Sequence, residues 1–491
     1  MIMPPLVAPI INLKSILPEI TVVITALVVL LFDLVTEKDK KSPLAYLSLF
    51  GLAIALFFSI SMWKTDMSLF AFNRLIVVDR FTLFFSSLFI VATFITILIS
   101  INYIREEGVN YGEYYTLVLL ATVGMMLMAK ANDLIIVFLG LETLSISIYV
   151  LVGFLRTNLK SNESSLKYFL LGAFSSAFLL YGIALVYGAT GSTKLPDIAR
   201  HLESLPQLVS NPLLLAAVGM LIVGFGFKMA LVPFHMWTPD VYEGAPTSIT
   251  AFMSVGVKAA AFSAFLRVFL SSFPMLRDDW TMILWILAVL TMTLGNVVAI
   301  VQENIKRMLA YSSIAHAGYI LVAMTAGGDM ATTSIIYYLM AYTLMNLGAF
   351  TVVILYSKKG EENILISDYA GAGFKYPFLS AAMTVFMFSL AGIPPLAGFV
   401  GKFYIFASAV KQGFIWLAII SVLNSLIAVY YYLRVTVLMY MKEPVKEVGH
   451  LSFSIPIIIA LLITAFFTLH MGILPSGYLH LARESIVMLM Q

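Results

Sequence analysis

Long apolar runs follow one another along almost the whole chain. Each run is roughly 20 residues long, the length of α-helix that crosses the hydrocarbon layer of a bilayer, and there are about fourteen of them. A water-soluble domain could not bury so many apolar side chains, because 61% of the 491 residues are hydrophobic and only 11% are charged. The pattern therefore predicts a multi-pass membrane protein.

The runs are continuously apolar, which distinguishes between the two architectures that can cross a membrane. A β-barrel would show segments of about ten residues in which polar and apolar side chains alternate. We therefore predict an all-α fold, as a single membrane domain over residues 1–491. The expected layout is a three-helix segment (1–110), two five-helix blocks (111–270 and 280–441), and a last helix with a surface tail (450–491).

Two of the apolar runs are interrupted by proline at membrane depth. They are GFGFKMALVPFH at residues 224–235 and LAGIPPLAGFVGK at residues 390–402. Proline lacks a backbone donor and clashes with the preceding turn, so each helix should break and leave carbonyl groups in need of a partner. By our count these are the seventh and twelfth helices, the fourth in each block of five. Matching broken helices in two halves indicate a transport path.

Ionisable side chains lie inside the apolar runs. The candidates are Glu142, Lys167, Lys228, His235, Lys258, His316 and Lys402. A charge at the bilayer centre costs about 2.5–3.5 kcal/mol, so the four charges at the most central positions together cost roughly 10–14 kcal/mol. That sum is comparable with the whole stability of a folded domain. These groups must therefore be paired or hydrated.

A proton relay is the chemistry that this set of residues fits. Burial disfavours the charged form of a lysine, while a nearby carboxylate favours it. Making or breaking a contact between Glu142 and Lys228 could therefore switch the lysine between holding and releasing a proton. His235 and His316 are of the residue type that titrates near neutral pH, and they could link lysines through water.

Each residue also has a simpler interpretation. A lysine near the end of a helix, such as Lys167, often only extends toward the headgroups. His235 and His316 could form hydrogen bonds in the core, and they could bind a haem, although nothing else in the sequence supports a haem. Four central charges on four different helices are harder to explain as structural residues, and they favour the relay.

The composition argues against several other classes of function. The chain has no cysteine, so it offers no thiolate for an iron–sulfur cluster and no disulfide. The net charge of +3 does not indicate a nucleic-acid partner, and we find no glycine-rich phosphate-binding motif. We expect no cofactor or metal on this chain.

Three motifs resemble one known family. They are KMALVPFHMWTPDVYEGAPT at residues 228–247, NIKRMLAYSSIAHAGY at 304–319 and GIPP at 392–395. All three are similar to the antiporter-like membrane subunits of complex I, the proton-translocating NADH:quinone oxidoreductase, and the similarity extends over residues 114–440. Lys402, where two of the three bacterial subunit types carry an acidic residue, makes the chain resemble the third type, called N. The family fold has two inverted five-helix repeats.

The resemblance implies a role for each candidate residue. Glu142 and Lys228 would form the coupling ion pair, Lys258 would be the central relay lysine, and Lys402 would exchange protons with the far side. Lys167 would act near the input side, and the remaining candidates, His235 and His316, would link the lysines.

The resemblance also implies partners and a location. The chain would be a subunit of a translocase in a bacterial inner membrane, beside a neighbouring antiporter-like subunit and small membrane subunits. NADH, FMN, iron–sulfur clusters and quinone would bind to partner subunits. A subunit of a Mrp-type cation/proton antiporter or of a membrane-bound hydrogenase is the alternative, because those proteins share most of the motifs.

Overall fold

The structure is a computed structural model, and it describes residues 12–37, 41–63, 69–357, 363–444, 451, 453–487 and 489. The helices up to residue 272 are α1 (Leu17–Val35), α2 (Ser42–Met62), α3 (Arg80–Glu106), α4 (Gly112–Lys130), α5 (Leu134–Val152), α6 (Leu159–Thr190), α7 (Leu195–Ser204), α8 (Pro212–Met229), α9 (Thr238–Gly244), α10 (Thr247–Phe252) and α11 (Lys258–Ser272). The later helices are α12 (Arg277–Ile300), α13 (Ile305–Ala326), α14 (Gly328–Tyr356), α15 (Ala372–Lys375), α16 (Pro377–Ala391), α17 (Ala397–Lys411), α18 (Ile415–Met441), α19 (Ile455–Ile473) and α20 (Ser476–Ile486).

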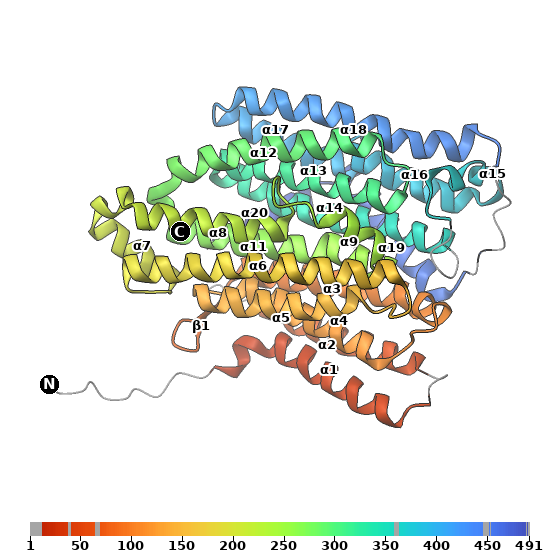
Figure 1. The fold of residues 1–491 in the computed structure, drawn as a ribbon, viewed down its shortest axis with the longest axis horizontal. Coiled ribbons are helices and arrows are strands. Elements are labelled where there is room, and N and C mark those ends of the chain that lie inside the picture. Colours follow the sequence, from red (N-terminus) through yellow and green to blue (C-terminus); the bar gives the residue numbers. More distant parts are fainter. Residues whose placement is uncertain are drawn as a thin grey trace.

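The long helices lie side by side, with α1 and α2 at one edge of the bundle and α17 and α18 at the other (Figure 1). Within the described residues, thirteen helical segments are long and apolar enough to cross a membrane. The pair α16 and α17 forms one more crossing in two short pieces, which agrees with the predicted total. One small exception to the all-α prediction is an antiparallel hairpin of β1 (Leu69–Ala71) and β2 (Ile76–Val78).

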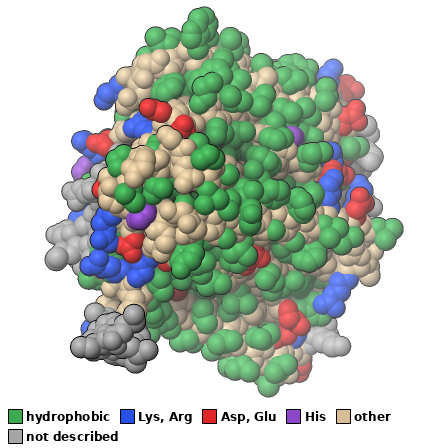
Figure 2. Space-filling model, turned by 60° about the vertical axis from the view of Figure 1, so that its left-hand side comes forward, with side chains coloured by type: hydrophobic (Ala, Val, Ile, Leu, Met, Phe, Trp, Pro, Cys, Tyr) green, Lys and Arg blue, Asp and Glu red, His purple; other side chains and the backbone are tan. Residues whose placement is uncertain are grey.

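The surface agrees with a membrane setting. Hydrophobic side chains form a broad belt across the face shown in Figure 2, while most charged side chains gather toward its two ends. α10, α11, α13 and α14 are almost completely enclosed by the other helices. The functional candidates on these inner helices are therefore isolated from lipid.

Both predicted helix breaks are present, and they have the same geometry. The C-cap of α8, Ala230, has the left-handed conformation (φ 60°), and the N–H of Leu231 bonds back to the carbonyl of Gly226 at 2.8 Å. The C-cap of α16, Gly392, is also left-handed (φ 89°), and the N–H of Ile393 bonds back to the carbonyl of Phe388 at 3.0 Å. This is the hydrogen-bonding pattern of the Schellman C-cap, followed in both segments by proline. The proline prevents either helix from resuming at once.

One departure from the predicted helices concerns the eighth crossing. The sequence predicts a continuous helix there, but a π-helical segment (Met253–Val257) separates α10 from α11. Such widened turns are rare and often lie at functional sites. Lys258 is the first residue after this segment.

Two buried ion pairs connect the N-terminal helices to the rest of the bundle. Glu19 on α1 pairs with Lys130 on α4 at 2.8 Å. Asp79, the N-cap of α3, accepts two hydrogen bonds from Arg267 on α11, at 2.9 and 3.0 Å. Such pairs specify which helices meet, because breaking one leaves an unpaired charge inside the protein.

We predict that Asp79→Asn destabilises the protein by about 3–5 kcal/mol, because the Arg267 charge stays buried without its counter-ion. Asparagine can still cap the helix, so the substitution isolates the loss of charge. The control is Asp197→Asn, which breaks the exposed pair with Arg200, a kind of pair that contributes less than about 1 kcal/mol. Thermal unfolding of the purified protein measures both. Equal shifts in the two variants would contradict the prediction.

Candidate functional site

Lys228, in the last turn of α8, is buried, and its ammonium faces aromatic rings. Nζ lies 5.2 Å from the ring centres of Tyr149 and Tyr168 and 5.6 Å from that of Phe227. The Tyr149 hydroxyl lies 3.4 Å from Nζ and accepts a weak hydrogen bond. The cation is therefore surrounded by π-faces and one hydroxyl, which favour a positive charge in a dry interior.

Glu142 is not the direct partner of this lysine. No carboxylate of the described residues lies within 4.0 Å of the Lys228 amine, so the predicted contact is not formed in this structure. Instead the Glu142 carboxylate accepts a hydrogen bond of 2.5 Å from Ser176 on α6. Glu142 and Tyr149 are seven residues apart on one face of α5, so the tyrosine that contacts the lysine lies two turns from the carboxylate.

Lys258, at the start of α11, forms its hydrogen bond to α13. Its amine donates to the backbone carbonyl of Ser313 on α13 at 2.6 Å. One turn before it, Ser254 in the π-helical segment accepts a hydrogen bond of 2.6 Å from Asn346 on α14. The widened turn thus lies between two inner helices, and the lysine is directed toward the helix that carries His316.

His316 is enclosed by two tyrosines. Its Nδ1 lies 2.5 Å from the hydroxyl of Tyr338, and its Nε2 lies 2.9 Å from the hydroxyl of Tyr432. Tyr432 in turn bonds to the Ser312 hydroxyl. Both ring nitrogens are engaged by groups that can donate or accept, so a proton can enter at one nitrogen and leave from the other.

Lys402 on α17 satisfies the carbonyl groups that the second helix break releases. Its amine donates to the carbonyls of Leu390 and Ala391, each at 2.9 Å, and to the Ser425 hydroxyl at 3.1 Å. It also lies 4.8 Å from the ring centre of Tyr319. The last carbonyls of a helix carry partial negative charge, so the end of α16 stabilises this cation.

Lys167 belongs to a charged cluster near one end of the bundle. Its amine pairs with Asp240 on α9, which also pairs with Arg307 on α13 at 2.8 Å. Glu243 pairs with the same arginine at 2.9 Å and with Lys160 at 2.8 Å. Partial burial by itself would raise the pKa of the Asp240 carboxyl, but the two cations outweigh it and lower that pKa below its usual value. The carboxylate therefore stays ionised at neutral pH and joins α6 to α13.

None of the seven candidates, all of which are described, forms a hydrogen bond or ion pair with another of the seven. His235 lies in the non-helical segment after α8, is partly exposed, and its Nδ1 is buried without a hydrogen-bond partner among the described residues. Sequence reasoning in turn missed Tyr149, Tyr168, Asp240 and Arg307. Asp240 and Arg307 lie inside the family motifs, which could have indicated them. Nothing distinguishes the two tyrosines among the 24 in the chain.

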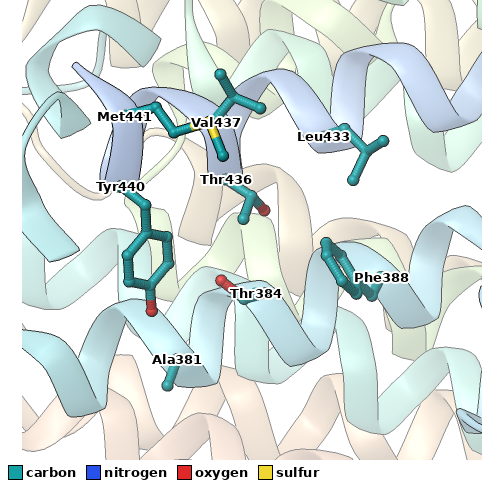
Figure 3. A pocket seen from close by; sticks show the side chains of 8 residues that line it. All are labelled: Ala381, Thr384, Phe388, Leu433, Thr436, Val437, Tyr440 and Met441. Atoms are coloured by element: carbon teal, nitrogen blue, oxygen red, sulfur yellow. The ribbon is translucent and has the colours of Figure 1, made fainter.

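A pocket of about 490 Å³ lies away from these residues, between α16 and α18 (Figure 3). It is lined by Ala381, Thr384, Phe388, Leu433, Thr436, Val437, Tyr440 and Met441. Its lining includes no aspartate, glutamate, lysine, arginine or histidine, and none of the seven candidates.

Comparison with known proteins agrees with the motifs. The model of the family described as NADH:quinone oxidoreductase/Mrp antiporter, TM, matches residues 131–428. The chain belongs to this family. A curated relative from Trichlorobacter lovleyi, NADH-quinone oxidoreductase subunit N, is 52% identical over 97% of both chains.

Solved structures show the same architecture. A chain of respiratory complex I from Thermus thermophilus with bound Aureothin is 34% identical, with a TM-score of 0.81 over 95% of this chain and all of that one. A chain of the Mrp complex from Dietzia sp. DQ12-45-1b is 20% identical, with a TM-score of 0.84 over 98% of both. The second likeness concerns the fold alone. The family's multi-pass architecture thus matches the predicted one.

The absence of cysteine allows a direct test of which positions water-soluble reagents reach. Glu163 and Ser254 each lie four residues before a candidate lysine, but Glu163 is exposed and Ser254 is completely buried. We predict that a membrane-impermeant maleimide labels the Glu163→Cys variant and leaves the Ser254→Cys variant unlabelled in the folded protein. Both should react after denaturation. Rapid labelling of the second variant in the folded state would contradict the buried placement.

Proposed function

We propose that this chain is the N-type proton-translocating membrane subunit of an NADH:quinone oxidoreductase. The observation that carries the proposal is the series of ionisable groups buried on α8, α11, α13 and α17, with a partly buried one on α5, in a chain 52% identical to a protein named for that role. Reduction of quinone would occur elsewhere in the assembly. This chain would supply the proton path.

Electrostatic coupling between Glu142 and Lys228 would control the path. If the carboxylate came within about 4 Å of the amine, it would stabilise the protonated lysine by about 4 kcal/mol at an effective dielectric constant of 20. That energy changes a protonation equilibrium by roughly a thousandfold. In this structure the two groups are apart, each with its own partner, and this arrangement would be the open state of the pair, in which they do not touch.

The other candidates would carry the proton along the bundle. Lys167 would receive it near the charged cluster, Lys258 would hold it in the middle, and His316 would pass it toward Lys402. Lys402 would exchange it with the far side. His235, whose buried Nδ1 has no hydrogen-bond partner among the described residues, would link the lysines through water.

We also propose an internal repeat, partner subunits and a membrane location for the chain. The two breaks with matching geometry support two inverted repeats, over residues 111–270 and 280–441, preceded by residues 1–110 and followed by residues 450–491. The partners would be a neighbouring antiporter-like subunit and small membrane subunits in a bacterial inner membrane. NADH, FMN, iron–sulfur clusters and quinone would be bound by partner subunits.

Substitution in the intact complex tests the relay. We predict that Glu142→Ala and Lys228→Ala each reduce coupled NADH:quinone turnover and proton pumping at least several-fold, because the switching pair is lost. Turnover and acidification of proteoliposomes measure both. The matched control is Lys411→Ala, an exposed lysine on the same helix as Lys402, which should leave both rates unchanged. Near-normal pumping in both test variants would refute the relay and favour a structural role for the buried charges.

A cation/proton antiporter of the Mrp type, or a membrane-bound hydrogenase subunit, is the second candidate, because the family model includes antiporters and a Mrp complex has the same fold. Purification in mild detergent distinguishes these possibilities. We predict that the chain co-purifies with NADH-oxidising subunits that contain iron–sulfur clusters. Co-purification with antiporter subunits, without NADH oxidation, would support the alternative.

A further inference from the structure

We infer that Tyr149, Tyr168 and Phe227 form an aromatic cage that holds protonated Lys228 whenever Glu142 is withdrawn, and so act as positioning residues for the proton relay. This inference rests on the proposed function, because it concerns how the relay lysine keeps its proton. Lys228 thus has two alternative partners, the cage and the carboxylate.

The geometry of the cage supports this role. Three rings lie within 5.2–5.6 Å of the ammonium, inside the distance of about 6 Å at which a cation is attracted to a ring face. The rings come from three helices, α5, α6 and α8. Trp237 stabilises the cage from outside. Its ring stacks on that of Tyr168, with 4.4 Å between the ring centres, and its indole N–H donates to the Phe227 carbonyl at 3.0 Å.

Ring faces, rather than hydroxyl groups, are the feature that the three residues share. Phe227 has no hydroxyl, and the buried Tyr168 hydroxyl forms no hydrogen bond with the described residues. Only the Tyr149 hydroxyl approaches the amine, at 3.4 Å, which is long for a hydrogen bond. A cage of π-faces attracts a cation but gives a neutral amine no comparable benefit, so it favours the protonated lysine.

Gly172 and Ser176 on α6 contact the two residues of α5 that interact with Lys228 in the proposal. A Cβ atom at Gly172 would lie 2.0 Å from the Tyr149 hydroxyl, so glycine makes the space for that ring. One turn further along, Ser176 holds the Glu142 carboxylate. The same face of α6 thus positions the cage and the withdrawn carboxylate, so each charge has a neutral partner while the two are apart.

Few titratable groups surround the lysine. Glu142 and Tyr149 come from α5 and Tyr168 from α6, while α11 packs against α8 through apolar contacts such as Phe265 with Phe225. Lys258, at the start of α11, turns toward α13 instead. The pH dependence of the relay at this position should therefore respond mainly to the carboxylate and to the cage.

The pH profile of coupled turnover in the intact complex tests the cage. We predict that Tyr168→Leu and Tyr149→Leu move the alkaline limb to lower pH by about 0.5–1 unit, because a lysine without the cage releases its proton more readily. Tyr168→Phe should restore the wild-type profile. The control is Phe174→Leu, a lipid-exposed ring on α6, which should leave the profile unchanged. Wild-type profiles in both leucine variants, or equal shifts in the leucine and phenylalanine variants at Tyr168, would overturn the cage.

A second measurement keeps the inference testable if the leucine variants fail to assemble. Incorporation of mono-, di- and trifluorinated phenylalanine at position 227 weakens the ring's attraction for cations while nearly preserving its shape. We expect a progressive shift of the alkaline limb with fluorination, and a constant profile would overturn the cage. Failure of the relay itself is distinguishable, because in that case Lys228→Ala would also leave pumping intact.

Discussion

A charged group at membrane depth has no bulk water around it, so the protein must supply the groups that solvate it. This constraint accounts for the main features of the interior. Lys402 is solvated by two carbonyls and a hydroxyl, Lys258 by one carbonyl, and Lys228 by ring faces. Glu142 is held by a serine hydroxyl. None of these groups has a full counter-ion among the described residues, so the charges remain able to exchange partners.

The places where regular helices are interrupted supply much of this solvation. The end of α16 releases the carbonyls that Lys402 binds, and the end of α8 places Lys228 inside the aromatic cage. The π-helical segment comes directly before Lys258. Each of these three lysines thus lies at a place where an α-helix ends or widens, or bonds to one. In contrast, the structural pairs Glu19–Lys130 and Asp79–Arg267 have a full counter-ion each, which suits a fixed connection between helices.

The sequence predicted the crossings, both helix breaks and the isolated charges, because these features depend on local signals: apolar length, proline, and an ionisable residue in an apolar run. It did not predict the partners of the charges, since these depend on which helices become neighbours. The sequence predicted a contact between Glu142 and Lys228 that forms and breaks, but it did not indicate Ser176 and Tyr149, which bond to the two groups in this structure. The left-handed conformation of Ala230 could not be predicted either, because glycine is the usual residue in that conformation after the end of a helix.

The central claim is that these buried groups hand protons along a hydrated path between helices. High-resolution electron cryo-microscopy of the intact complex during turnover tests it most directly, through the positions of ordered water. We expect water molecules that connect the amines of Lys228 and Lys258 with the imidazole of His316 and the amine of Lys402. Dry, closely packed side chains between these groups in every state would contradict it.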